Sequence, residues 1–127
     1  MIVAGVGCRS GASAEEIEQV VRLALDTFKL PVERLDALAT ESAKATEPAL
    51  VEAARRLAVT LSACTLDDLD RVAGRVLTPS KLVLETKGVP SIAEASALVI
   101  AGRNARLLGT RVASARATCA IAIGEGR

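Results

Sequence analysis

The stretch "IVAGVGCRSGASAEEI", residues 2–17, joins an apolar run to an amphipathic one through a segment with glycine at positions 5, 7 and 11. Residues 2–6 predict a buried strand, because they are apolar and turn-forming residues follow them. Ser13 and Glu16 have the spacing of a capping box, in which the serine oxygen accepts a backbone N–H and the glutamate reaches back. The stretch therefore predicts a strand, a tight turn and the start of a helix.

Cap residues and helical spacing predict the remaining helices. The helix after Ser13 has an apolar stripe formed by Ile17, Val20, Val21, Ala24, Leu25 and Phe28. Further N-cap residues are expected at Thr46, Thr65 and Ser91. Pro48 suits the first turn of the second helix, and Ser91 with Glu94 repeats the capping-box spacing.

Short apolar runs predict strands between these helices, at residues 35–39, 59–63, 82–84, 105–109 and 117–123. Such alternation favours a single three-layer α/β/α domain over residues 1–127, with a mostly parallel central sheet. In such sheets ligands bind outside the carboxyl ends of the strands. The loops that follow the strands, at residues 5–13, 40–47, 64–65 and 85–91, are therefore expected to form any site.

Composition limits the chemistry that this chain can perform. The 127 residues include three cysteines that are far apart and no histidine. This pattern excludes Ser-His and Cys-His dyads and indicates neither a disulfide framework nor a metal site, so no metal or cofactor is expected. No apolar run approaches the roughly 20 residues of a membrane span, and no signal peptide is recognisable, so a cytoplasmic protein is expected.

The net charge of +1 conceals an uneven distribution. Residues 1–70 carry 7 basic and 12 acidic side chains, whereas residues 71–117 carry 8 basic and 2 acidic ones. Between Glu94 and Glu125 the only charged residues are Arg103, Arg106, Arg111 and Arg116. This run is either a solvated basic edge or a surface that faces an anion. Nucleic acid is not the expected partner, because the chain lacks the aromatic residues on which single-stranded bases stack.

The glycine-containing loop supplies the first candidate ligand contacts. Gly7 and Gly11 either permit a tight turn or let backbone amides approach an anion at a helix start. Arg9 can hold a carboxylate or phosphate through two hydrogen bonds. Cys8 is either an inert packed thiol or a nucleophile activated by its position. The spacing GxGxxxG differs from the dinucleotide fingerprint, and no Walker lysine follows it.

Polar residues follow two other predicted strands. Thr40, Ser42, Lys44 and Glu47 form one loop, in which Lys44 can pair with a ligand carboxylate and Glu47 can orient it. The alternative is capping and solvation alone. Glu85, Gly88 and Ser91 form the other candidate set, with Gly88 allowing close approach.

Three segments in order resemble one protein family, the CobE and CbiG C-terminal domain of cobalamin biosynthesis. They are "GVGCRSGASAEEI", "LATESAKATEPALVEAARRL" and "LVLETKGVPSIAEASAL". The resemblance covers nearly the whole chain and is of the stand-alone CobE type. It implies a role in making the corrin ring, with a corrin or precorrin intermediate and possibly other cobalamin-pathway enzymes as partners.

The leading hypothesis is therefore a protein that binds a carboxylated precorrin or corrin intermediate as a carrier or accessory to ring synthesis. The resemblance also implies an alternative, because full-length CbiG proteins open a precorrin lactone and release acetaldehyde. The catalytic residues of such a hydrolase are unknown, with Glu47, Glu85 and Cys8 as candidates. A nucleotide-binding regulatory domain is a third hypothesis, against which the missing phosphate fingerprint counts.

Overall fold

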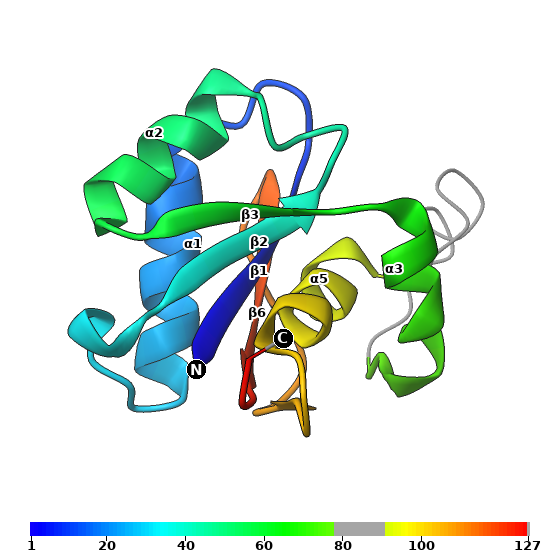
Figure 1. Cartoon of the computed structure of the whole chain (residues 1–127). Coiled ribbons are helices and arrows are strands. Elements are labelled where there is room, and N and C mark those ends of the chain that lie inside the picture. Colours follow the sequence, from blue (N-terminus) through cyan, green and yellow to red (C-terminus); the bar gives the residue numbers. More distant parts are fainter. Residues whose placement is uncertain (78–90, 127) are drawn as a thin grey trace.

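Strands and helices alternate along the chain in a computed structural model that describes residues 1–77 and 91–126 (Figure 1). The longer elements are β1 (Ile2–Cys8), α1 (Ala14–Thr27), β2 (Ala37–Glu41), α2 (Pro48–Leu57), β3 (Thr60–Cys64), α3 (Leu66–Arg71), α5 (Ile92–Ala101) and β6 (Ala117–Ile123). Two-residue strands, β4 (Arg106–Leu107) and β5 (Val112–Ala113), lie before β6, and short 3-10 turns cover Val32–Arg34 and Ala73–Arg75.

The strands form one sheet in the order β3-β2-β1-β6-β4, with β5 paired to β6. The pairs β1–β2 and β2–β3 are parallel, and β6 runs antiparallel to β1 along the whole length of both strands. The predicted α/β fold, with a mostly parallel central sheet between helix layers, is confirmed. The antiparallel strands all come from the C-terminal part of the chain.

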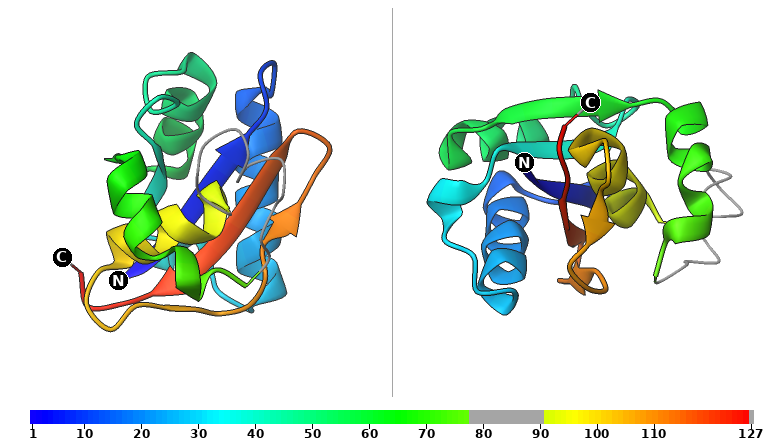
Figure 2. Two further views of the ribbon diagram at one scale, coloured as in Figure 1. Left: turned by 90° about the vertical axis from the view of Figure 1, so that its right-hand side faces the viewer. Right: turned by 60° about the horizontal axis from the view of Figure 1, so that its bottom comes forward.

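Helices cover both faces of the sheet, as the two views in Figure 2 show. Side chains alternate along β1 and so supply two separate cores. Ile2, Ala4 and Val6 pack with α1 and α2, whereas Val3 packs with α5 and α3. Both cores consist almost entirely of Ala, Val, Leu and Ile, which agrees with a composition that offers a single aromatic residue.

Gly5 lies inside β1 rather than in the loop after it, and its missing side chain lets α5 approach the sheet. A Cβ at this position would lie 1.9 Å from the carbonyl oxygen of Ala93 and 2.7 Å from the amide nitrogen of Ala97, both on α5. The backbone of α5 therefore packs directly on β1. This contact explains why nearly every residue of α5 is buried.

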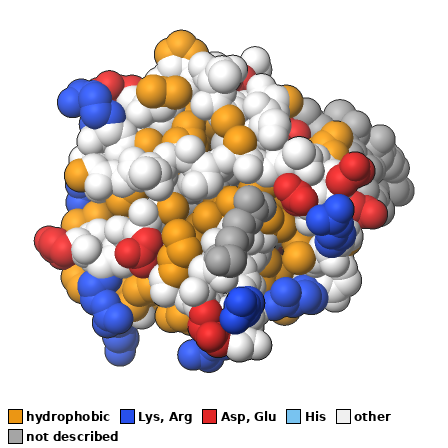
Figure 3. Space-filling model, in the orientation of Figure 1, with side chains coloured by type: hydrophobic (Ala, Val, Ile, Leu, Met, Phe, Trp, Pro, Cys, Tyr) orange, Lys and Arg blue, Asp and Glu red, His pale blue; other side chains and the backbone are white. Residues whose placement is uncertain are grey.

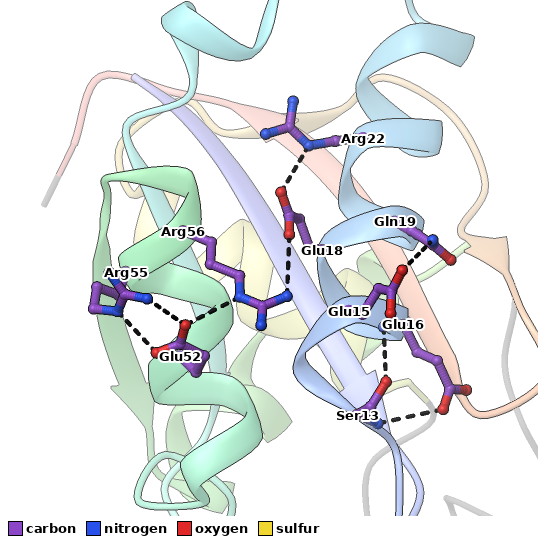
Figure 4. A network of polar contacts seen from close by, with 9 residues as sticks. All are labelled: Ser13, Glu15, Glu16, Glu18, Gln19, Arg22, Glu52, Arg55 and Arg56. Carbon is purple, nitrogen blue, oxygen red and sulfur yellow. Dashed lines mark hydrogen bonds and ion pairs between the residues drawn. The ribbon is translucent and has the colours of Figure 1, made fainter.

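Both N-terminal helices form as the sequence predicts, and polar contacts tie them together (Figure 4). Ser13 and Glu16 form the predicted capping box, with 3.1 Å between the serine Oγ and the Glu16 amide nitrogen. Glu18 on α1 lies 3.0 Å from Arg22 and 3.7 Å from Arg56 on α2. Such surface ion pairs contribute only about 0.2–1 kcal/mol each, so apolar packing dominates the contact between α1 and α2.

Several predicted boundaries were wrong. β2 begins two residues after the predicted start, because Leu35 ends a 3-10 turn and the Asp36 carboxylate accepts the N–H of Ile2 at 2.6 Å. The N-cap of α2 is Glu47 and not Thr46, since Pro48 occupies the first turn. The predicted strand at residues 105–109 shortens to β4. The predicted strand at residues 82–84 lies outside the described residues.

Candidate functional site

The carboxyl ends of β1, β2 and β3 meet at one edge of the sheet, which we call the carboxyl edge. Glu41 of β2 pairs with Cys64 of β3, and Gly5 of β1 pairs with Ala39, so the three strands end side by side. The loops that leave β1 and β2 both lie at the top of the molecule in Figure 1. The sequence predicted this convergence of loops.

Helices α1, α2, α3 and α5 all begin near the carboxyl edge. Ser13 and Thr65 cap α1 and α3 immediately after the loops that leave β1 and β3. The start of α5 lies over Gly7, where an added Cβ would be 3.7 Å from Ile92 and 3.8 Å from the amide of Ala93. Because helix N-termini carry partial positive charge, this edge of the fold favours anions.

Thr40 and Ser42 use their hydroxyl groups to hold strand ends together. Thr40 is fully buried, and its Oγ1 donates to the carbonyl of Val6 at 2.8 Å. Ser42 donates from both Oγ and N to the carbonyl of Cys64, at 3.0 and 2.8 Å. These contacts give both residues a structural role, in which they set the position of the loop that follows.

Lys44 and Glu47 lie in that loop and pair with each other. The Lys44 Nζ is 3.2 Å from Glu47 Oε1, and the lysine side chain is 21% exposed against 37% for the glutamate. Backbone hydrogen bonds from Lys44 N to the Glu41 carbonyl and from Glu47 N to the Lys44 carbonyl hold the turn. The loop therefore presents a partly buried cation at the carboxyl edge.

Cys8 lies at the end of β1, within the electrostatic reach of this loop. Burial raises the pKa of the Cys8 thiol, Glu47 and Glu41 raise it further, and Lys44 opposes them. The sulfur is therefore mainly a thiol at neutral pH, which is the unreactive form. Cys64 and Cys119 are fully buried, and burial raises the pKa of Cys119 strongly.

We expect Cys8 to react with iodoacetamide more slowly than an exposed cysteine at mildly alkaline pH, because only the thiolate reacts. Replacing Glu47 by Gln removes a negative neighbour and should shift the rate profile to lower pH. Glu33→Gln, at an exposed site near the other end of β2, serves as the control and should not change it. A rate that is unaffected by Glu47→Gln would show that the two side chains do not interact.

The loop after β1 is held by residues from the far end of the chain. Arg9 donates its backbone N–H to the carbonyl of Arg116 at 2.8 Å, and Arg116 Nη1 donates to the carbonyl of Gly11 at 3.1 Å. Gly11 has φ +89°, a conformation that favours glycine. These contacts leave the exposed Arg9 side chain on a fixed loop.

Arg111 and Arg116 were not assigned to the site from sequence, although their acid-free run was recognised. The pairing of β6 with β1 places Ala117 opposite Cys8, which brings Arg116 to the glycine loop. Arg111 Nη1 lies 3.4 Å from the Oγ of Ser91, the residue that caps α5. The sequence could not place Arg111 and Arg116 at this site, because their positions follow from the antiparallel pairing of β6 with β1.

Two other residues predicted to contact a ligand, Gly7 and Ser91, make hydrogen bonds within the fold. Gly7 lies within β1, and its carbonyl accepts a hydrogen bond from Thr118 Oγ1 at 3.3 Å. Ser91 is buried, and its Oγ accepts the amide of Glu94 at 3.3 Å. Glu85 and Gly88 lie outside the described residues, so their predicted roles stay predictions.

The part of the chain that the structure describes contains no cluster of three or more His, Cys, Asp or Glu side chains able to hold a metal ion. None of the helices among the described residues combines the length and the apolar character that a membrane span requires.

Comparison with known proteins gives consistent matches over almost the full length. Residues 2–122 match the family described as Cobalamin synthesis G C-terminus. Protein CobE from Sinorhizobium sp is 36% identical over 121 residues, which cover 95% of this chain and 79% of that protein.

Solved structures agree with this match. The crystal structure of CobE, described as a protein from the cobalamin (vitamin B12) biosynthetic pathway, has a TM-score of 0.93 at 34% identity and covers 100% of this chain and 92% of that one. The cobalamin biosynthesis protein chiG from Agrobacterium tumefaciens str. C58 has a TM-score of 0.74 at 38% identity, covering 98% and 99%. A putative cobalamin biosynthesis protein G homolog from Sulfolobus solfataricus has a TM-score of 0.74 at 27% identity, covering 98% of this chain but 37% of that one.

The resemblance expected from the three sequence segments is thus confirmed by sequence and by fold. The chain belongs to the family of the cobalamin synthesis G C-terminus, and its role lies in cobalamin biosynthesis.

Proposed function

We propose that this protein binds a carboxylated corrin or precorrin intermediate at the carboxyl edge and serves as a carrier or accessory in corrin-ring synthesis. The observation that carries the proposal is the gathering of cations and helix N-termini at this edge. Arg9, Lys44, Arg111 and Arg116 come from separate parts of the chain and lie around the starts of α1, α2 and α5.

The chemistry of the ligand fits this arrangement. Corrin intermediates are large flat macrocycles with acetate and propionate side chains around the ring. Arginine side chains bind carboxylates through paired hydrogen bonds, and helix N-termini attract anions. Cations distributed around an edge therefore suit a ligand whose negative charges lie on its circumference.

Binding is favoured over hydrolysis by the state of Cys8 and Glu47, the two candidate catalytic groups that the structure describes. The raised pKa of Cys8 keeps it protonated, and the chain has no histidine to act as its base. Glu47 forms an ion pair with Lys44 at 3.2 Å, so its carboxylate already has a cationic partner. These groups can hold a ligand more readily than they can activate water.

Titration with a metal-free corrin polycarboxylic acid, followed by visible absorbance, tests the proposal. We expect a saturable spectral change whose affinity falls as salt is added, because partly exposed ion pairs are screened. The corresponding neutral corrin amide should bind much more weakly. The absence of any spectral change at low salt would contradict the proposal.

A second assay separates binding from catalysis. Incubation with a lactone-bearing precorrin should release no acetaldehyde beyond the uncatalysed rate. Release of many equivalents per protein molecule would identify a hydrolase and overturn the carrier role.

Cys8→Ser should leave the affinity for the corrin acid within a few-fold of the wild-type value, because the thiol supplies neither charge nor nucleophile. The same titration measures this change. Mass spectrometry that found a substrate fragment attached to Cys8 in the wild type would refute the prediction.

A further inference from the structure

Among the residues that the structure describes, β3 is the last strand on one side of the sheet. It pairs with β2, and within residues 1–77 and 91–126 no strand pairs with its other side. The Cys64 carbonyl accepts the N–H of Ser42, so Cys64 is directed toward β2. Because direction alternates along a strand, the N–H and C=O groups of Leu61 and Ala63 point away from the sheet.

This edge lacks the features that usually prevent strands of different molecules from pairing. Natural edge strands carry charged residues or proline, contain bulges, or are very short. The sequence of β3, "TLSAC", contains neither charge nor proline and pairs with β2 in regular register over its whole length. The opposite edge is protected, since β4 has two residues and includes the exposed Arg106.

The surface around β3 has the composition of an interface. In Figure 3, which shows this side of the molecule, backbone and uncharged polar atoms cross the face with hydrophobic side chains above and below, and most charged groups lie toward the margin. A centre depleted of charged side chains is typical of protein–protein interfaces.

Helix α2 contributes an exposed apolar side chain on the same side. Its inner face packs on the sheet through Leu50, Ala53, Ala54 and Leu57. Arg56 points toward α1, where it lies 3.7 Å from Glu18. Helical geometry places Val51 on the opposite flank of α2, beyond β3, and this side chain is 50% exposed.

We propose that two copies of this chain pair antiparallel through β3, so that a continuous sheet crosses the dimer. In this register Leu61 lies opposite the second copy's Ala63, and Ser62 lies on the two-fold axis. Every outward N–H and C=O of Leu61 and Ala63 then has a partner. The strand is self-complementary because it is uncharged and the register is symmetric.

Charges on α2 fit a second copy in the same arrangement. The two-fold axis sets the α2 helices antiparallel, with the Val51 side chains between them. Glu52 and Arg55, which pair within one copy, then face the same pair in reverse order. Each guanidinium therefore approaches the carboxylate of the other copy, and this complementarity selects a second copy over an unrelated peptide as the occupant.

Sedimentation velocity over a wide concentration range tests the proposal. The wild type should shift from the 13.1 kDa monomer toward twice that mass as concentration rises. Ala63→Pro should raise the dissociation constant by about tenfold or more. Proline lacks the N–H that would donate to the second copy, and the Ala63 N–H makes no hydrogen bond to β2 within one copy. Val51→Glu should have a similar effect, and it decides the question if Ala63→Pro fails to fold by circular dichroism.

Leu23→Glu is the matched control, since Leu23 is also 50% exposed on a helix but lies on α1. It should dimerise like the wild type. A wild type that stays monomeric at all concentrations would overturn the proposal, as would a dimer that neither β3 nor α2 substitutions weaken.

A cysteine pair tests the register. In a Cys8→Ser background, Ser62→Cys should form a disulfide-linked dimer on oxidation, because directly opposed residues without mutual hydrogen bonds lie about 4.5 Å apart at Cα. Ala63→Cys should not, because the two copies of residue 63 are offset along the strands. Cross-linking of Ala63→Cys equal to that of Ser62→Cys, or of neither variant, would contradict this register and with it the proposed dimer.

Discussion

Gly5→Ala is expected to lower the free energy of unfolding by about 3 kcal/mol or more, at the upper end of the cost of overpacking a core. The added Cβ would meet the Ala93 carbonyl at 1.9 Å and the Ala97 amide at 2.7 Å. Both are backbone atoms of a buried helix, so neither can rotate away. Relief requires α5 to move off β1, which disrupts the core shared by these elements and α3. Urea unfolding followed by circular dichroism measures the change.

Gly74→Ala provides the matched control for the same chemical change. Gly74 lies in a 3-10 turn, and among the described residues no heavy atom beyond its own chain neighbours lies within 4 Å of an added Cβ. The free energy of unfolding of Gly74→Ala should stay within about 0.5 kcal/mol of the wild-type value or rise slightly, because alanine restricts the conformations of the unfolded chain. Equal stabilities for the two variants would show that α5 does not rest on β1 as described.

Arg9→Ala is expected to weaken binding of the metal-free corrin acid by about 1.5–3 kcal/mol, the range for hydrogen bonds to charged groups and thus roughly 10- to 150-fold. The loop that carries Arg9 is fixed by Arg116 and by the left-handed conformation of Gly11. Because the loop backbone is fixed, binding has to order only the Arg9 side chain and not the loop. Lys44→Ala should cost less, because an ammonium makes a less directional contact and Lys44 already pairs with Glu47.

Arg34→Ala is the control for loss of a positive charge, since Arg34 is exposed in the turn that precedes β2, away from the carboxyl edge. It should bind like the wild type at moderate salt. If Arg9→Ala folds and also binds like the wild type, the glycine loop is only a turn, and the site must be sought among the arginines of residues 103–116.

The sequence by itself determined the elements whose signals are local. The capping box at Ser13 and Glu16 and the cap at Thr65 form as predicted, because each depends on residues three positions apart. The apolar stripe of α1 is buried where helical spacing predicted it. Strand and helix alternation was sufficient to predict the α/β class and the convergence of loops at one edge, since parallel strands end on the same side.

Boundaries were harder to predict because the competing interactions are not local. β2 starts late owing to a hydrogen bond between Asp36 and Ile2, which are far apart in the chain. Thr46 has the side chain of a good N-cap, but the turn closed by the Lys44 and Glu47 backbone places the cap one residue later. Strand and capping propensities are properties of single residue types. The start of β2 and the N-cap of α2 depend instead on which other group forms a hydrogen bond with the residue.

The tertiary structure alone decided how the candidate site is assembled. Gly7 was expected in a turn, yet it lies in β1 together with Gly5, which admits the backbone of α5. Arg116 reaches the loop at Gly11 because β6 inserts antiparallel beside β1, a contact across more than a hundred residues. Local spacing sets periodicity and caps through neighbours three or four residues away, but it does not encode which distant strand completes a sheet. That choice depends on how the two cores pack, and it brings the C-terminal arginines to the N-terminal loop.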